Sequence, residues 1–197
     1  MNDYPESYPP APPESKTTRQ TLFRFLVDVL ETLVLSLILF LAINAISARI
    51  RVDGSSMEPT LHNGEFVIVN KLAYKLGVAK QGDIVVFHFP RDPSQEYIKR
   101  IIGTAGDEVV IQDGAVYING KELVEPYISA PPSYPAGRWV VPEGHLYVLG
   151  DNRNNSSDSH TWGTLPMEYV IGKALFVYWP LEEWGTIEHA SGANTAP

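Results

Sequence analysis

The sequence has no cysteine among its 197 residues. Disulfide bonds, thiolate catalysis and zinc sites built on sulfur are therefore excluded. Basic residues are also few, because 15 lysines and arginines stand against 23 aspartates and glutamates and give a net charge of −8. Binding of nucleic acid needs a basic surface, so this balance argues against a nucleic-acid partner. The length allows one folded domain with accessory segments.

Charge is absent from residues 32–48, which read TLVLSLILFLAINAISA. A run of this length is at the short end of the roughly 17–25 residues that cross a bilayer as a helix. A buried core helix is one alternative, but soluble helices rarely stay apolar on every face for so long. A cleaved signal sequence is another, with Ala45-Ile46-Ser47 as a small-x-small cleavage site. The long segment before the run and the length of its apolar core favour a retained anchor.

After residue 51 the sequence changes to short apolar runs separated by turn signals. Asp113-Gly114 between two such runs is typical of a two-residue hairpin turn. These runs predict a mainly β fold, with an antiparallel β-sheet domain behind one N-terminal transmembrane helix. We expect a disordered proline-rich tail (1–20), a helix with the anchor (21–50), a β-rich domain (51–182) in which residues 107–142 could form a small inserted subdomain, and a flexible tail (183–197).

Three segments carry polar residues in unusual settings. Residues 54–61, GSSMEPTL, bring small residues and a proline just after the apolar run, and alone they indicate only a turn. Lys99 stands in a strand-like apolar run, where a lysine usually reaches solvent. If it is buried instead, its pKa falls because the charged form is desolvated. Residues 150–160, GDNRNNSSDSH, could be a solvated loop or a loop ordered by its Asx and serine turns.

Together these segments resemble bacterial type I signal peptidases, the leader peptidases with a Ser/Lys dyad. The family's Ser-Met-x-Pro-Thr box matches residues 56–60. Its Tyr-x-Lys-Arg box, followed by Gly-x-x-Gly-Asp, matches residues 97–107, and its Gly-Asp-Asn-Arg-x-Asn-Ser-x-Asp-Ser box begins at Gly150. The resemblance covers residues 20–182 and includes the anchor.

The resemblance implies a membrane-bound serine endopeptidase that cleaves N-terminal signal peptides from exported preproteins after small-x-small sites, typically Ala-x-Ala. The nucleophile falls on Ser56 rather than Ser55, because Ser56 directly precedes Met-x-Pro-Thr. The general base falls on Lys99, which must be neutral to take the Ser56 proton. The family's supporting roles fall on Ser156, which orients the lysine amine, and on Asp158, which braces the site.

Two positions depart from the family's pattern. Some members carry a serine two residues before the nucleophile as an oxyanion donor, and here that residue is Gly54. We therefore expect backbone N–H groups to form the oxyanion hole, with the Ser56 N–H as the first candidate. His160 stands where many members have arginine, so a contact with Asp158 from this side is expected to depend on pH.

The resemblance also implies the surroundings of the dyad. Arg100 and Asp151 are expected to pair in support of the site. Shallow apolar pockets would accept small substrate side chains. We expect these pockets to be lined by Val52, Met57, Leu61, Tyr97 and Ile98. Each of the five could equally be an ordinary core residue. No metal or other cofactor is implied. The implied location is the cell membrane, crossed once, with the catalytic domain on the exported (periplasmic or extracytoplasmic) side. The partners are preprotein signal peptides and the lipid bilayer, and the oligomeric state stays open.

Three other functions compete with this interpretation. A histidine-based serine peptidase would have histidine at the position of Lys99. A catalytically inactive, membrane-anchored binding module is disfavoured because Ser56 and Lys99 are both present. A self-cleaving Ser-Lys repressor is disfavoured by the apolar span and by the acidic balance, since such proteins bind DNA.

Overall fold

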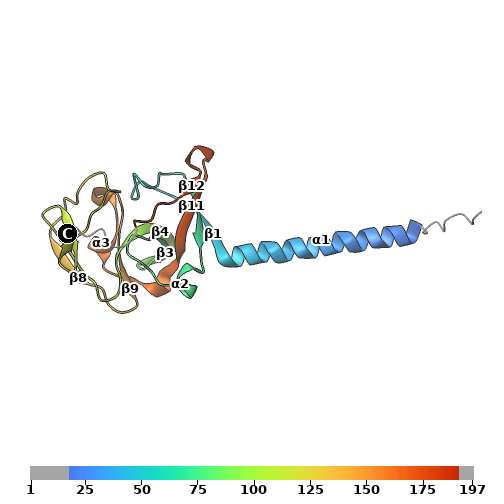
Figure 1. The fold of residues 1–197 in the computed structure, drawn as a ribbon, viewed down its shortest axis with the longest axis horizontal. Coiled ribbons are helices and arrows are strands. Elements are labelled where there is room, and N and C mark those ends of the chain that lie inside the picture. Colours follow the sequence, from blue (N-terminus) through green and yellow to red (C-terminus); the bar gives the residue numbers. More distant parts are fainter. Residues whose placement is uncertain (1–17, 191–197) are drawn as a thin grey trace, which may run out of the picture. The chain divides into compact units, whose positions relative to one another are not determined.

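The structure is a computed structural model, and it describes residues 18–190. The chain divides into two compact units, Met1–Ile43 and Asn44–Pro197. Helix α1 (Thr18–Ile46) runs through the described part of the first unit and ends in the second (Figure 1). The predicted helix extended to residue 50, but residues 47–51 form a strand instead, because they pair with a later segment of the chain.

Helix α1 has the length and composition of a membrane span. Its segment Gln20–Ile46 contains a window with a mean hydropathy of 2.5, and none of that window is buried. A helix of 27 residues is about 40 Å long at a rise of about 1.5 Å per residue, which exceeds the hydrocarbon core of a bilayer of about 30 Å. Length and apolar composition therefore agree with the predicted anchor.

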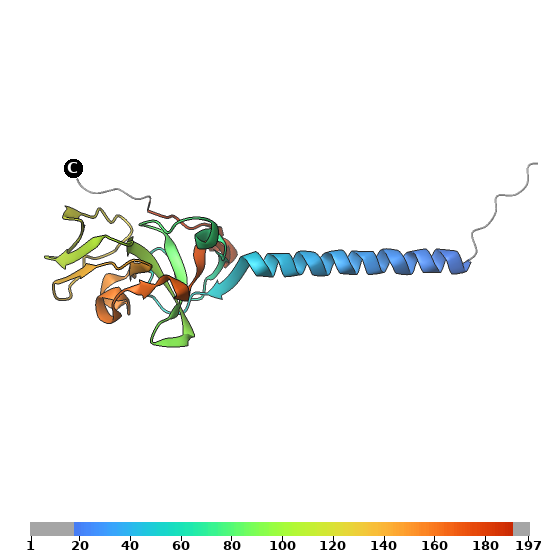
Figure 2. The same cartoon turned by 90° about the horizontal axis from the view of Figure 1, so that it is seen from below.

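The second unit is built from antiparallel strands, as predicted (Figure 2). The strands of the larger sheet are β1 (Ser47–Arg51), β2 (Phe66–Asn70), β3 (Ile84–Phe89), β4 (Asp92–Gly103), β9 (His145–Leu149), β10 (Leu165–Pro166), β11 (Val170–Trp179) and β12 (Gly185–Thr186). Their order is β1-β2-β11-β3-β4-β9-β10, and β12 pairs with β11. The smaller sheet has the order β7-β6-β5-β8, from β5 (Glu108–Gln112), β6 (Ala115–Ile118), β7 (Lys121–Glu122) and β8 (Gly137–Val140).

Helices in the second unit are short. The two α-helices are α2 (Ala73–Leu76) and α3 (Ser159–Trp162). The 3-10 helices are η1 (Arg153–Asn155), η2 (Met167–Tyr169) and η3 (Leu181–Glu183). None of the helices described after α1 exceeds four residues, so the strands and the loops between them position the side chains of this unit.

The hairpin turns follow the residue types in the sequence. Asp113 and Gly114, between β5 and β6, have φ angles of 51° and 77°. Asn119 and Gly120, between β6 and β7, repeat this with 52° and 79°. Two consecutive positive φ angles define the tight turn that Asp-Gly and Asn-Gly favour. The predicted hairpin at Asp113-Gly114 is thus confirmed.

Strand β3 explains how the core is divided. Its side chains alternate between two hydrophobic clusters, with Ile84 and Val86 in one and Val85 and Phe87 in the other. Both faces of β3 are therefore buried, which is why its sequence is continuously apolar instead of alternating. A third cluster joins the smaller sheet to Tyr147 and Leu149 of β9, so the two sheets share a core.

The end of the chain is more ordered than the expected tail from residue 183. Strand β12 pairs with β11, and Ile187 is buried in the first hydrophobic cluster. Packing against β11 therefore continues to this point. The remaining parts of the expected tails, residues 1–17 and 191–197, lie outside the described residues.

A core substitution tests the third cluster. Ile111 is 1% exposed, so Ile111→Ala should lower the free energy of unfolding by about 2–4 kcal/mol through lost burial and a residual cavity. Val140→Ala on the same sheet is the control, because Val140 is 63% exposed and should cost under about 0.5 kcal/mol. Urea unfolding of the full chain in detergent, followed by tryptophan fluorescence, measures both. Equal midpoints for the two variants would contradict the assigned core.

Candidate active site

Three segments that are distant in the sequence meet at one edge of the larger sheet. Ser56 lies in the loop between β1 and β2, and Lys99 lies on β4. Pairing of Arg100 with Leu149 across β4 and β9 brings the loop that begins at Gly150 beside Lys99. Lys99 Nζ lies 2.7 Å from Ser56 Oγ and 2.8 Å from the Ile98 carbonyl oxygen.

The Ser56 loop is held by asparagines of the loop after β9. The Asn152 backbone N–H donates to the Ser56 carbonyl oxygen at 3.1 Å. The side-chain amide of Asn152 donates to the Ser55 carbonyl oxygen at 3.1 Å, and that of Asn155 donates to Ser55 Oγ at 2.9 Å. These asparagines were not among the predicted site residues, although their concentration in residues 150–160 was the signal that could have found them.

Lys99 is buried although it carries an amine. Its exposed fraction is 4%. Desolvation lowers the pKa of Lys99 from its ordinary value of 10.5 to about 8, against the opposing negative charges of Asp158 and Asp151. A neutral amine at 2.7 Å from a serine hydroxyl can accept the hydroxyl proton, which is the arrangement that activates a serine nucleophile.

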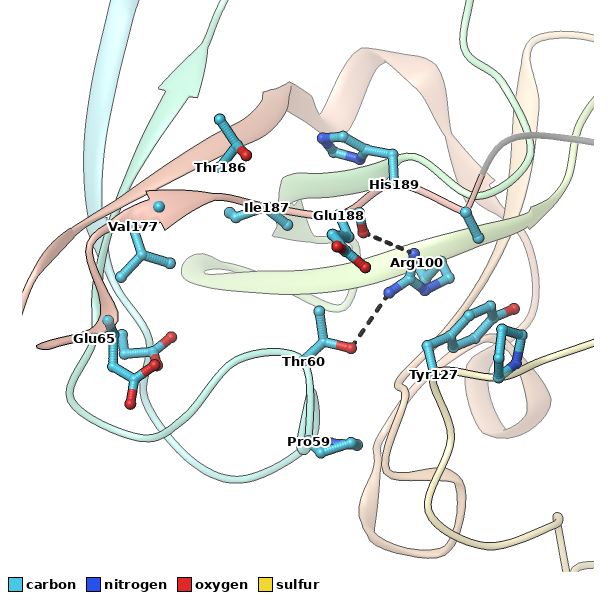
Figure 3. A pocket seen from close by; sticks show the side chains of 14 residues that line it. Pro59, Thr60, Glu65, Arg100, Tyr127, Val177, Thr186, Ile187, Glu188 and His189 are labelled. Carbon is cyan, nitrogen blue, oxygen red and sulfur yellow. Dashed lines mark hydrogen bonds between the residues drawn. The ribbon is translucent and has the colours of Figure 1, made fainter.

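The residue after Lys99 forms a buried ion pair. Arg100 donates from Nε to Asp151 Oδ1 at 2.8 Å and from Nη2 to Oδ2 at 2.7 Å. Thr60 Oγ1 donates to the same Oδ2 at 2.5 Å. Arg100 also donates to Thr60 Oγ1 at 3.4 Å, and its guanidinium lies over the ring of Tyr127 (Figure 3). This pair connects β4, the Ser56 loop and the loop after β9. Breaking a buried pair by removing one partner typically costs about 3–5 kcal/mol.

Asp158 anchors the loop after β9 from inside. Its side chain is fully buried, and Oδ2 accepts the Gly150 N–H at 2.9 Å. Oδ1 lies 2.6 Å from His160 Nδ1. The His160 ring is stacked on Tyr134, with ring centroids 3.9 Å apart and planes 7° apart. His160 thus contacts Asp158 from the side on which the sequence analysis expected a pH-dependent contact.

Ser156 does not make the contact that the sequence analysis expected. Its Oγ is buried and has no hydrogen-bond partner among the described residues. The Lys99 amine instead uses Ser56 Oγ and the Ile98 carbonyl oxygen. The Ser156 side chain lies against Gly150, beside the Ser56 carbonyl oxygen.

Two glycines shape the backbone around Ser56. A Cβ atom on Gly150 would collide with the Ser156 side chain and the Ser56 carbonyl oxygen, so only glycine allows this approach. Gly54 has a φ of +92°, which disfavours a side chain there even though the space is open. The Ser56 N–H makes no hydrogen bond with any residue in the range 18–190, so it is free to bind an oxyanion.

A cavity of about 450 Å³ opens beside the Ser56–Lys99 pair. Its lining is Ile50, Arg51, Asp53, Ser56, Gln95, Glu96, Tyr97, Ile98, Lys99 and Ser157. Tyr97 and Ile98 were expected there. The other expected pocket residues, Val52, Met57 and Leu61, are at most 2% exposed and belong to the first hydrophobic cluster. Their side chains point into the core, so the charged residues of β1 and β4 form more of the cavity wall than the sequence suggested.

No metal site is apparent in the described part of the chain. Residues 18–190 contain no group of three or more histidine, aspartate or glutamate side chains that could hold a metal ion.

Known proteins match this chain over most of its length. The family model described as "Signal peptidase, peptidase S26" matches residues 26–179. The chain belongs to this signal peptidase family. The probable signal peptidase I-2 of Synechocystis sp. is 44% identical over 164 residues, which cover 80% of this chain and 75% of that protein. The signal peptidase I of Leptolyngbya laminosa is 41% identical over 170 residues, 82% of this chain and 84% of that protein.

A solved signal peptidase I structure, from Enterococcus faecalis V583, is 32% identical. It covers 48% of this chain and 95% of the solved chain, with a TM-score of 0.44. The family model and the two relatives confirm the resemblance noted in the sequence at the level of the family, and the chain is a peptidase of the signal peptidase type.

A methyl group on Gly150 tests the packing behind the Ser56–Lys99 pair. Gly150→Ala should lower the free energy of unfolding by about 1–3 kcal/mol because of overpacking, and it should slow peptide cleavage about 100-fold by displacing Ser56. Gly185→Ala is the matched control, since its nearest neighbour would lie 3.9 Å from the new Cβ. Thermal unfolding and cleavage rates in detergent measure both effects. Equal behaviour of the two variants would contradict the close approach at Gly150.

A pH series tests the burial of the Lys99 amine. The folded chain releases this proton near pH 8 and the unfolded chain near pH 10.5. Between these values the unfolded state binds more protons, so this group makes the free energy of unfolding rise with pH. Lys99→Met removes the effect, so the parent should gain about 3 kcal/mol relative to this variant across that window. Parallel stability curves for the two proteins would show that the pKa of Lys99 is not lowered.

Proposed function

We propose that this chain cleaves N-terminal signal peptides from exported preproteins after small-x-small sites, with Ser56 as nucleophile and neutral Lys99 as general base. The observation that carries the proposal is the contact of 2.7 Å between Lys99 Nζ and Ser56 Oγ. Its chemical meaning comes from the burial that lowers the pKa of Lys99 to about 8, because only an unprotonated amine can take the serine proton.

The reaction follows from this pair. Ser56 Oγ attacks the scissile carbonyl carbon while its proton moves to Lys99 Nζ. The tetrahedral intermediate collapses as the protonated Lys99 gives that proton to the leaving amine, and an acyl-enzyme ester remains on Ser56. Lys99, neutral again, then takes a proton from water as the water oxygen attacks the ester carbonyl carbon. The second tetrahedral intermediate collapses, Lys99 returns the proton to Ser56 Oγ, and the acyl product leaves.

Neighbouring groups are proposed to stabilise the oxyanion and to orient the Lys99 amine. The free Ser56 N–H is the candidate donor to the developing oxyanion. Ser156 is proposed to orient the Lys99 amine after a rotation of its buried, unpartnered hydroxyl. Asp158 and the Arg100–Asp151 pair hold the loops against which both residues pack.

The edge of β4 suggests how a peptide binds. Residues Tyr97 and Ile98 pair with β3 on one side, whereas pairing with β9 on the other side begins only at Arg100. Although the Ile98 carbonyl oxygen accepts from Lys99 Nζ, β4 has no second strand partner before Arg100 among the described residues, and an extended peptide in the cavity is proposed to pair there. Tyr97 and Ile98 are the proposed apolar walls for small substrate side chains, and Val52, Met57 and Leu61 support these walls from the core.

The location is proposed from helix α1. A single span formed by α1 would hold the peptidase unit at a membrane, where the apolar part of a signal peptide also lies. We propose the cell membrane, with the β unit on the exported side. A histidine base is not supported, because none of the residues that line the cavity beside Ser56 is a histidine.

Cleavage of a purified preprotein tests the dyad. Ser56→Ala and Lys99→Ala should each lower kcat/KM by about 100- to 10,000-fold, since a positioned general base alone contributes that much. Ser129→Ala and Lys121→Ala, both at exposed positions, are the matched controls and should cleave near the parent rate. For the parent, kcat/KM should rise tenfold per pH unit below about pH 8 and level off above it, because Lys99 acts in its neutral form. Parent-like cleavage by either dyad variant would refute the mechanism.

The same assay tests specificity. Replacing the alanine before the scissile bond by leucine should reduce kcat/KM by about 100-fold or more. Overpacking of a shallow pocket costs up to several kcal/mol, and each increase of about 1.4 kcal/mol in the barrier slows the reaction tenfold. Equal cleavage of the alanine and leucine substrates would disprove the small-x-small preference while leaving the dyad intact.

A further inference from the structure

A second cavity of about 450 Å³ lies beside the Ser56 loop. Pro59 and Thr60 of that loop border it, and it shares no lining residue with the cavity that contains Ser56. Its apolar walls include Val177 of β11 and Ile187, which follows β12 (Figure 3). A volume of this size is within the range of about 300–1,000 Å³ that holds small ligands.

Glu65 is the buried carboxylate of this second cavity. Its exposed fraction is 4%, and its Oε2 atom is buried without a hydrogen bond to any residue in the range 18–190. Figure 3 shows its side chain facing the cavity from the side opposite Arg100. Burial raises the pKa of Glu65 against the opposing effect of His62, and the negative charge of Glu183 adds to the rise. A buried carboxylate without a partner is unfavourable, so a positively charged ligand would stabilise it.

Two further carboxylates line the second cavity. Glu183 and Glu188 are exposed members of its lining. Within the described residues, neither of them nor Glu65 forms a salt bridge. Like charges that share one cavity repel one another, so this grouping favours a positively charged occupant.

The basic side chains in the same lining do not neutralise these carboxylates. Arg100 donates from Nε and Nη2 to the carboxylate of Asp151, which balances its charge. Burial lowers the pKa of His189 to about 4, so its ring is neutral near neutral pH. The second cavity therefore has an excess of negative charge.

The arrangement of these carboxylates decides which kind of cation fits. No single metal ion can be held by all of them, because residues 18–190 contain no group of three or more acidic or histidine side chains that could hold one. A suitable ligand carries separate positive charges, joined by an apolar chain that packs on the apolar walls. Linear aliphatic polyamines have this structure, since short methylene chains separate their ammonium groups.

We infer that the second cavity binds a linear aliphatic polyamine, whose ammonium groups pair with Glu65, Glu183 and Glu188 while its methylene groups pack on Val177 and Ile187. Each ammonium group would make charge-assisted hydrogen bonds, and each buried methylene group would add apolar burial. The inference goes beyond the proposed function, because it requires neither the cleavage reaction nor the membrane anchor.

A ligand in the second cavity would contact the Ser56 loop through Thr60. Thr60 Oγ1 donates to Asp151 Oδ2 at 2.5 Å, and Arg100 binds the same carboxylate. A ligand that packs against Thr60 limits the motion of this loop. Exchange of the backbone amide hydrogens of residues 57–63 should therefore slow when spermidine is added to the parent, and it should not change in Glu65→Gln.

Calorimetric titration of the full chain with spermidine, in an uncharged detergent at neutral pH and low salt, tests the inference directly. Spermidine should bind the parent and raise the midpoint of its thermal unfolding as its concentration increases. Glu65→Gln should weaken binding by about 10- to 100-fold, because a charge-assisted hydrogen bond to a buried carboxylate is lost. Thermal unfolding without spermidine shows whether this variant is folded.

The two exposed carboxylates give a second test that leaves the core unchanged. The combined variant Glu183→Gln, Glu188→Gln should weaken spermidine binding by about 1.5- to 5-fold for each charge removed. The combined variant Glu122→Gln, Glu143→Gln is the matched control, because it loses the same charge at exposed positions outside the cavity lining. This control should bind spermidine as the parent does.

Three other ligands test the chemistry of the occupant. Butylamine has one ammonium group, and Mg²⁺ has its charge on one ion, so each should bind at least about tenfold more weakly than spermidine. A Lys-Lys dipeptide with blocked ends presents two ammonium groups on a peptide. It should also bind more weakly, because its amide groups would lose water against Val177 and Ile187.

Each result supports or overturns the inference. Parent-like binding by a folded Glu65→Gln variant, or equal weakening in the Glu122→Gln, Glu143→Gln control, overturns the assignment to this cavity. Butylamine or Mg²⁺ binding as tight as that of spermidine overturns the polyamine, and tighter binding of the dipeptide overturns a free polyamine as the occupant. Preprotein cleavage enters none of these measurements, so a chain that binds spermidine but does not cleave overturns only the proposed function.

Discussion

Burial of one amine is the constraint on which the site depends. Lys99 can touch Ser56 only if it gives up water, and that loss lowers the pKa of Lys99 to about 8. Burial in an apolar sheet alone would leave the amine without directional contacts. The Ser56 hydroxyl and the Ile98 carbonyl oxygen supply them. Asp158 and Asp151 limit the fall of the pKa, because their negative charges favour the protonated form.

The same constraint explains why so many polar groups surround an apolar strand. A short contact between side chains of two loops and one strand requires that the loops do not move. Buried hydrogen bonds of the Arg100–Asp151 pair and the Asp158 carboxylate meet this need, together with a partly buried one from the Asn152 amide. The buried polar groups thus serve position as well as stability, since the site tolerates little displacement.

The two departures from the family's pattern have different structural meanings. Gly54 has a left-handed backbone, so the absence of a side chain there belongs to the conformation of the loop. His160 keeps a contact with Asp158 and adds a stacking partner in Tyr134. The first departure leaves the Ser56 N–H as the available donor, and the second retains a cation-capable group beside a buried carboxylate.

The sequence by itself determined the antiparallel β class, the apolar helix and the hairpin at Asp113-Gly114, because periodicity, length and turn chemistry are local properties. It also indicated Ser56 and Lys99 through their motifs. Only the tertiary structure decided that Lys99 is buried against Ser56, that Val52, Met57 and Leu61 face the core, and that Ser156 makes no contact with Lys99. Burial and side-chain direction depend on which strands pair. Strand β4 pairs with β9, which lies about fifty positions later in the chain. No local sequence pattern carries information over that separation.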